Sequence, residues 1–146
     1  MADRIGMLLA VFDTARSRLL KALLSAGLLT GTLAVEAEWQ SYGSTEVVGE
    51  RYYLDPSTIQ PTSVGFATVV LSNYPVPIRE SFGTFQSVRS EVEMDCKNHQ
   101  LRDIGIQFYR QPMGKGRLIF QAMGTGGFQS WLPGSLNEIL HELICK

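Results

Sequence analysis

The chain has 146 residues, 45% hydrophobic and 18% charged, with 13 Lys and Arg against 14 Asp and Glu. This length fits one domain with a modest hydrophobic core. The charges nearly balance and are spread along the sequence, which argues against nucleic acid as a partner, because nucleic-acid binding rewards a concentrated basic face.

The first 37 residues differ in composition from the rest. Four basic residues precede an apolar run at 22–34 and the tripeptide Val35-Glu36-Ala37: Arg4, Arg16, Arg18 and Lys21. This order predicts a signal peptide at 1–37, cleaved after Ala37, and a mature domain at 38–146. An ordinary N-terminal helix is the alternative. The charged region of the signal peptide is long and has its own apolar stretch at 7–12, so the position of the true start, at Met1 or at Met7, is left open.

The predicted export does not involve a membrane span or a lipid anchor. The apolar run is shorter than the roughly 20 residues that a transmembrane helix requires. No Cys precedes Cys96, so the mature N-terminus lacks a cysteine that could carry a lipid. We therefore expect a periplasmic or secreted protein and leave surface display open.

The clearest strand lies at 87–96. Val88, Val92, Met94 and Cys96 alternate there with polar residues, which predicts a strand with one face in the core. Weaker patterns predict five more strands, at 39–42, 51–54, 66–73, 102–109 and 118–121.

Turn signals separate these strands. Asp55-Pro56-Ser57 and Gln60-Pro61-Thr62 follow the second strand, Pro75 and Pro77 follow the third, and a Pro and Gly turn lies at 112–116. The short connections favour antiparallel pairing, since a parallel crossover needs about a dozen residues.

The C-terminal segment has helical periodicity. Ser135-x-x-Glu138 predicts a capping box, and one apolar stripe follows, formed by Leu136, Ile139, Leu140 and Leu143. Cys145 falls opposite this stripe, so the helix must fray or end near Ile144 for Cys145 to reach the sheet. The predicted fold is α+β, with about six antiparallel strands and a C-terminal helix packed on one face.

The two cysteines, Cys96 and Cys145, most often pair in an exported domain, because the periplasm and the exterior are oxidising. One alternative is a zinc site, because Cys96-x-x-His99 and His141-x-x-x-Cys145 supply two sulfurs and two imidazoles. Free thiols are the other. We predict a disulfide and surface positions for both histidines, and we assign no metal.

The sequence offers little material for catalysis. No nucleophile-elbow motif is present, and the glycine-rich stretches at 114–116 and 124–127 do not match a phosphate-binding loop. Glu91 and Glu93 alternate on the outward strand face beside Arg89, which is typical of a solvated surface. We expect no enzymatic activity and no cofactor.

Several landmarks together resemble a known family. They are Trp39, Tyr53-Leu54-Asp55 with Ser57-Thr58-Ile59, Asp95-Cys96, Tyr109, and Trp131-x-Pro133-Gly134-Ser135 running to Cys145. The mature chain resembles the surface-adhesin protein E family of bacterial envelope proteins. The resemblance implies a small antiparallel sheet with a C-terminal helix, no catalytic centre, and adhesion to host extracellular-matrix and serum proteins such as laminin and vitronectin.

The resemblance favours a non-catalytic envelope protein that binds a protein partner or itself. The adhesin that names the family is lipid-anchored, whereas this chain has no lipobox cysteine. A periplasmic small-ligand binder or an unrecognised periplasmic enzyme is the alternative, which a polar cluster in a concave pocket would favour.

The strand at 66–73 suggests where such a partner binds. It is apolar on both faces, with Phe66 and Val70 on one and Ala67, Val69 and Leu71 on the other. If Val88, Val92, Ile104, Ile106 and Phe108 face the helix, Tyr109 points away from it. Three covers for the second face are open: the loops after Pro75 and Pro112, a second copy, or a partner. We predict an interface that contains Ala67, Val69, Leu71 and Tyr109.

Overall fold

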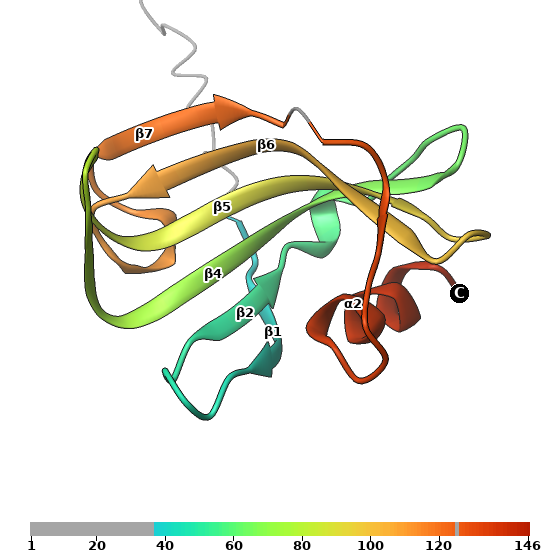
Figure 1. Cartoon of the computed structure of the whole chain (residues 1–146), viewed down its shortest axis with the longest axis horizontal. Coiled ribbons are helices and arrows are strands. Elements are labelled where there is room, and N and C mark those ends of the chain that lie inside the picture. The colour runs from blue at the N-terminus through green and yellow to red at the C-terminus, as the bar shows by residue number, and fades with distance from the viewer. Residues whose placement is uncertain (1–36, 125) are drawn as a thin grey trace, which may run out of the picture. The chain divides into compact units, whose positions relative to one another are not determined.

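The computed structural model describes residues 37–124 and 126–146. Residues 1–36, which carry almost all of the predicted signal peptide, lie outside the described residues, and the cleavage site remains a prediction. The described chain is one antiparallel sheet with a C-terminal helix (Figure 1), as the sequence predicted.

In the described residues the sheet has 8 strands, and its main order is β1-β2-β4-β5-β6-β7. Short β3 pairs with β4, and short β8 pairs with β6. The strands are β1 (Gln40–Ser44), β2 (Arg51–Leu54), β3 (Gln60–Pro61), β4 (Gly65–Glu80), β5 (Gly83–Asp95), β6 (Gln100–Tyr109), β7 (Leu118–Met123) and β8 (Gln129–Ser130). The helical segments are the 3-10 turns η1 (Pro56–Thr58) and η2 (Pro112–Gly114) and the helix α2 (Leu136–Ile144).

The prediction that Pro75 and Pro77 end the third strand was wrong, because β4 continues through both to Glu80. Pairing of β2 with β4 stops at Asn73, so β4 is an edge strand beyond that point. The pairing of β4 with β5 shifts register between Asn73 and Ile78. Proline is tolerated at an edge or a bulge because no ladder hydrogen bond is lost there.

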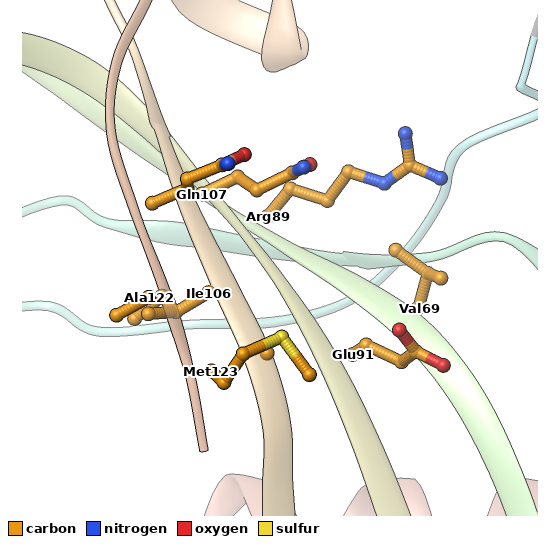
Figure 2. Close-up of a pocket in the computed structure, with 9 residues that line it drawn as sticks. Val69, Arg89, Glu91, Ile106, Gln107, Ala122 and Met123 are labelled. Atoms are coloured by element: carbon orange, nitrogen blue, oxygen red, sulfur yellow. The ribbon is translucent and has the colours of Figure 1, made fainter.

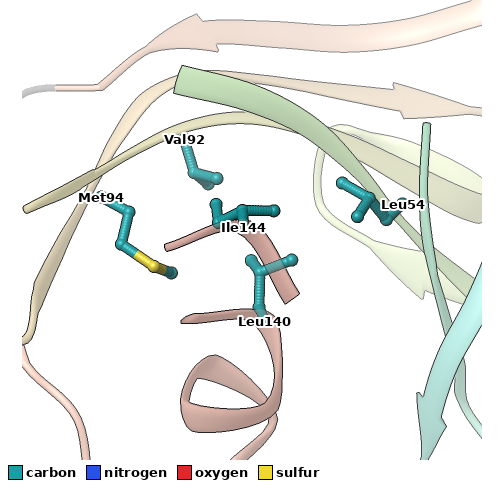
Figure 3. Packing of buried hydrophobic residues seen from close by; sticks show 5 residues of the cluster. All are labelled: Leu54, Val92, Met94, Leu140 and Ile144. Atoms are coloured by element: carbon teal, nitrogen blue, oxygen red, sulfur yellow. The ribbon is translucent and has the colours of Figure 1, made fainter. Parts of the chain in front are cut away.

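Helix α2 packs on one face of the sheet, which we call the inner face. Figure 3 shows the five buried residues of this contact, Leu54, Val92, Met94, Leu140 and Ile144. Met94 is fully buried and Leu140 is 1% exposed, so this contact forms the centre of the core. The sheet and the helix both contribute apolar side chains to this contact.

The predicted helix stripe needs one correction. Leu140 and Ile144 are buried, whereas Ile139 and Leu143 are 39% and 46% exposed. The buried side of α2 is therefore rotated relative to the predicted stripe. The helix ends at Ile144, and Cys145 is its C-cap. This end agrees with the requirement that Cys145 reach the sheet.

The predicted capping box is not formed. The helix begins after Ser135, but the Ser135 hydroxyl makes no capping hydrogen bond and is buried without a partner. The Glu138 carboxylate accepts instead from the backbone N–H of Gly134, at 2.5 Å. The start of the helix packs closely on β1, since a Cβ at Gly43 would lie 2.3 Å from Leu136 Cδ2. Glycine at position 43 is what allows this approach.

Candidate functional site

The face of the sheet opposite α2, which we call the outer face, contains all four residues of the predicted interface. Cross-strand pairs place Tyr53 beside Leu71, Val69 beside Glu91, and Ser87 beside Tyr109. Along each strand, the residues of the outer face alternate with those that point into the core. The outer face is therefore the region in which to look for a binding surface.

The turn η2 covers one part of the outer face. Ser87 Oγ donates to the carbonyl of Gln111 at 2.6 Å and accepts from the N–H of Gly114 at 2.9 Å. The Met113 N–H donates to Asn73 Oδ1 at 2.8 Å, which holds a non-glycine residue at a φ of 59°. This positive φ is uncommon outside glycine, so the fold constrains the turn tightly.

Leu71 lies beneath this turn and is fully buried. The turn is in close contact with it, because a Cβ added at Gly114 would lie only 3.6 Å from Leu71 Cδ1. The prediction that Leu71 belongs to an exposed interface needs correction, because the chain's own loop after Pro112 covers it. That loop was one of the three covers that the sequence left open. Leu71 belongs to the internal packing of the protein.

Beyond η2 the outer face is open and forms a groove of about 430 Å³ across β4 to β7. Among the residues that line it are Val69, Arg89, Glu91, Gln107, Gln121 and Met123. Figure 2 shows Val69 beside the charged side chains of Arg89 and Glu91. Neither charge has an ion-pair partner within the described residues, so both are available to another molecule.

Of the four predicted residues, only Val69 lines this groove. Ala67 is half-buried beside Gln60 of β3, and Tyr109 donates its hydroxyl hydrogen to Gln107 Oε1 at 3.0 Å. The sequence reasoning missed Gln121 and Met123 as groove residues. The apolar and uncharged run at 118–123 was a usable signal, but the predicted strand stopped two residues early.

Glu93 departs from the prediction of a solvated surface. It is 6% exposed, and its Oε2 accepts from Arg102 Nε at 2.7 Å and contacts Arg102 Nη2 at 2.5 Å. The Arg102 guanidinium also lies 4.7 Å from the centre of the Phe128 ring. Burial of a carboxylate is costly unless it has such a partner. Glu91, by contrast, is exposed as predicted.

The predicted disulfide joins Cys96, which follows β5, to Cys145 at the end of α2, with a Cα–Cα distance of 5.6 Å. Both sulfurs are therefore unavailable as thiolate ligands, which removes the zinc alternative. The chain passes close to the bond, because a Cβ at Gly65 would lie 3.0 Å from Cys96 Sγ. The disulfide ties the sheet to the helix at the edge of the core.

The two histidines, for which the sequence predicted surface positions, lie together next to the disulfide. Their ring centroids are 4.6 Å apart, and the Trp131 ring lies 5.3 Å from His141. His141 Nε2 is 3.3 Å from the carbonyl oxygen of Cys96. His99 is exposed and His141 half-buried. In the described residues neither imidazole hydrogen-bonds a serine or threonine hydroxyl.

A cluster of three tyrosines, Tyr42, Tyr52 and Tyr74, surrounds the buried carboxylate of Glu50. Burial, followed by the charge of Glu50, raises the pKa of Tyr42 to about 12. Burial, with hydrogen bonding to Glu50, also raises the pKa of Tyr74 to about 12 and that of Tyr52 further. The sequence reasoning did not identify this cluster.

These three tyrosines are expected to ionise late in an absorbance titration at 295 nm. A raised pKa favours the folded state fully below the unfolded value of 10.0, and this contribution is lost as the pH rises through about 12. Replacing Glu50 with Gln should lower these pKa values, but burial should keep them above 10. If all five tyrosines titrate together near 10 in the folded protein, the cluster is not buried as described.

The described residues were also searched for membrane-spanning helices and metal-binding groups. None of their helices is long and apolar enough to cross a membrane. No group of three or more His, Cys, Asp or Glu side chains among them is arranged to hold a metal ion.

Comparison with known proteins places the chain in a family. The family model for surface-adhesin protein E matches residues 39–146. The selenomethionine form of Haemophilus influenzae protein E has 20% identity and a TM-score of 0.52, and the match covers 76% of this chain and 88% of that chain. Protein E from non-typeable Haemophilus influenzae has 20% identity and a TM-score of 0.49, with 77% and 78% covered.

At 20% identity and a TM-score of 0.52, the selenomethionine structure supports the fold alone, because fold does not determine function. A search of curated protein sequences finds no match. The family model spans nearly the whole described chain, including both cysteines of the disulfide. The chain belongs to the surface-adhesin protein E family.

Proposed function

We propose that this chain is an exported, non-catalytic, adhesin-like envelope protein that binds a protein partner through the groove on its outer face. The observation that carries the proposal is the groove of about 430 Å³, in which an apolar side chain lies beside unpaired charges of both signs. Residues 1–37 would act as the signal for export. Family membership supports an adhesin-like role.

The composition of the groove suits a protein surface. Val69 supplies apolar area at its floor, and Met123, which is 76% exposed, lies at its rim. Methionine and arginine are enriched in the cores of protein interfaces, where Arg89 could pair with a carboxylate of the partner. Glu91 provides the opposite charge, so the groove can select a partner by electrostatic complementarity.

The neighbouring strand adds a second recognition element. In the described residues β7 pairs with β6 alone, which leaves the other edge of β7 without a strand partner. The strand carries no charge, and Leu118 and Phe120 are 39% and 41% exposed. An unpaired edge can add a strand from another chain through main-chain hydrogen bonds. We infer that the partner belongs to the host extracellular-matrix or serum proteins; a second copy of this chain is the alternative.

Replacing Val69 with Lys should weaken partner binding and preserve the fold. Val69 faces Glu91 across the strands, so a lysine there gains an opposite charge and the sheet tolerates it. In the complex the same lysine would place a charge in an apolar contact, and we expect about a tenfold or larger loss of affinity. Surface plasmon resonance on immobilised laminin and vitronectin measures this loss.

The matched control is Val47→Lys, because Val47 is 97% exposed in the turn between β1 and β2. It adds the same charge away from the groove and should leave binding unchanged. Light scattering on the eluted protein tests the alternative, since a dimer that Val69→Lys dissociates would identify the partner as a second copy. Equal binding by both variants, or a monomer that binds neither protein, would contradict the proposal.

A further inference from the structure

A second cavity lies on the inner face, and the sheet separates it from the outer groove. It has a volume of about 320 Å³ and lies between the first turn of α2, β8 and the strands β4, β5 and β6. Tyr42 and Tyr52 close one side, and Asn137 and Gln129 lie on others. The volume is within the range of small-molecule sites, roughly 300–1,000 Å³.

Two serines create this cavity. The inner face is apolar under the helix, but Ser90 lies between Val70 and Ile106 in the cross-strand row, and Ser72 lies between Tyr52 and Val88. A valine or leucine at either position would extend into the cavity. Small polar residues in a row of apolar ones leave room and provide hydroxyl groups.

The polar groups around the cavity lack protein partners. Within the described residues the side chains of Ser72, Ser90, Gln129 and Asn137 form no hydrogen bond, and Ser130 Oγ accepts only a long one, at 3.5 Å, from Gln100. Hydroxyls and amides can each donate and accept. The cavity can therefore bind a ligand that carries several donors and acceptors of its own.

The charges around the cavity exclude an anion. Arg102 is the cation at its wall, and Glu93 already neutralises it. Asp103 adds an unpaired carboxylate, and Glu50 lies behind Tyr52. The rings of Tyr42 and Tyr52, 6.2 Å apart, provide aromatic surface on the remaining side. Hydroxyls, amides and aromatic faces without a free cation match the C–H faces and hydroxyls of a neutral sugar.

We propose that this inner cavity binds a neutral saccharide of one or two rings. Hydroxyls of the sugar would exchange hydrogen bonds with Ser72, Ser90 and Asn137, and one ring face would pack on a tyrosine. This site is distinct from the protein-binding groove, because it lies on the opposite face of the sheet. Its occupation does not depend on the proposed function.

Titration of the purified ¹⁵N-labelled protein with methyl glycosides of glucose, galactose, mannose and N-acetylglucosamine tests the proposal. At least one glycoside should cause saturable shifts of the amide signals of Ser72, Ser90 and Asn137. Asn137→Ala should weaken this binding by about tenfold, the effect of losing one hydrogen-bond partner in a site. Alanine at the second position of a helix keeps the fold, since it is a better helix former than asparagine.

The matched control is Gln121→Ala, which removes an amide from the outer groove and should leave sugar binding unchanged. Ser90→Leu should fill the cavity and abolish binding; if this variant does not fold, Asn137→Ala decides the question. The proposal is overturned if no glycoside shifts the cavity signals, if the shifts map to the outer face, or if only sulfate or tetramethylammonium causes them.

Discussion

Replacing Leu140 with alanine is expected to lower the free energy of unfolding by about 2–5 kcal/mol, the range for truncating a fully buried leucine. Leu140 is 1% exposed and belongs to the cluster that joins α2 to β2 and β5. The loss combines the removed apolar contacts with the cavity that remains, because a helix tethered at its C-terminal end cannot collapse freely onto the sheet. Urea unfolding followed by tryptophan fluorescence measures the change.

Leu143→Ala is the matched control for this experiment. It removes the same atoms from the same helix, but Leu143 is 46% exposed. Its expected effect is below about 1 kcal/mol, typical of surface substitutions. Similar losses for the two variants would mean that the helix packs through the stripe predicted from the sequence, with Leu143 inside, and would contradict the packing in Figure 3.

Removing the disulfide should have an effect of similar size. Cys96 and Cys145 are 49 positions apart, and the chain-entropy model gives about 4 kcal/mol for a loop of this length. This is a large share of the roughly 5–15 kcal/mol that stabilises a domain. We expect Cys96→Ala/Cys145→Ala to unfold at a clearly lower urea concentration than the oxidised protein.

The double variant also separates loop closure from local packing. Gly65, Trp131 and His141 surround the bond and keep their contacts when both sulfurs are removed, so the helix should remain folded at low urea. Far-ultraviolet circular dichroism checks this point. Equal unfolding midpoints for the oxidised protein and the double variant would show that the disulfide does not stabilise the domain.

The fold was largely predictable because its strands carry strong local signals. The segment at 51–54 was predicted with the bounds that β2 has, and the alternation at 87–96 identified the inner face of β5. Pro75 and Pro77 were misleading, since a proline ends a strand only where its missing N–H is needed for pairing with a neighbouring strand. Beyond Asn73, β4 has a partner on one side, and local sequence does not show which strands become edges.

The binding surfaces were harder to predict because they depend on contacts between distant residues. The alternation of β5 placed Ser87 and Glu93 on the face away from the core, but both are buried. The turn η2 covers Ser87, and Arg102 of β6 covers Glu93. Val69 was recognised from an apolar residue on a face expected to be polar, and this local signal did lead to the groove.

The two faces of the sheet present different groups. The outer groove has an apolar floor beside unpaired charges of both signs, and the inner cavity presents hydroxyl and amide groups beside the carboxylate of Asp103. The helix and disulfide position the first turn of α2 over the inner cavity.

Export is a precondition of the proposed function, because the disulfide and an adhesin-like role both require the chain to leave the reducing cytoplasm. The most direct measurement is intact-mass analysis, with thiol labelling, of the protein recovered from fractionated cells that produce it naturally. We predict a product that begins at Glu38, has no free thiol, and is found in the periplasm, the envelope or the medium. A full-length cytoplasmic product with both Cys96 and Cys145 reduced would contradict it.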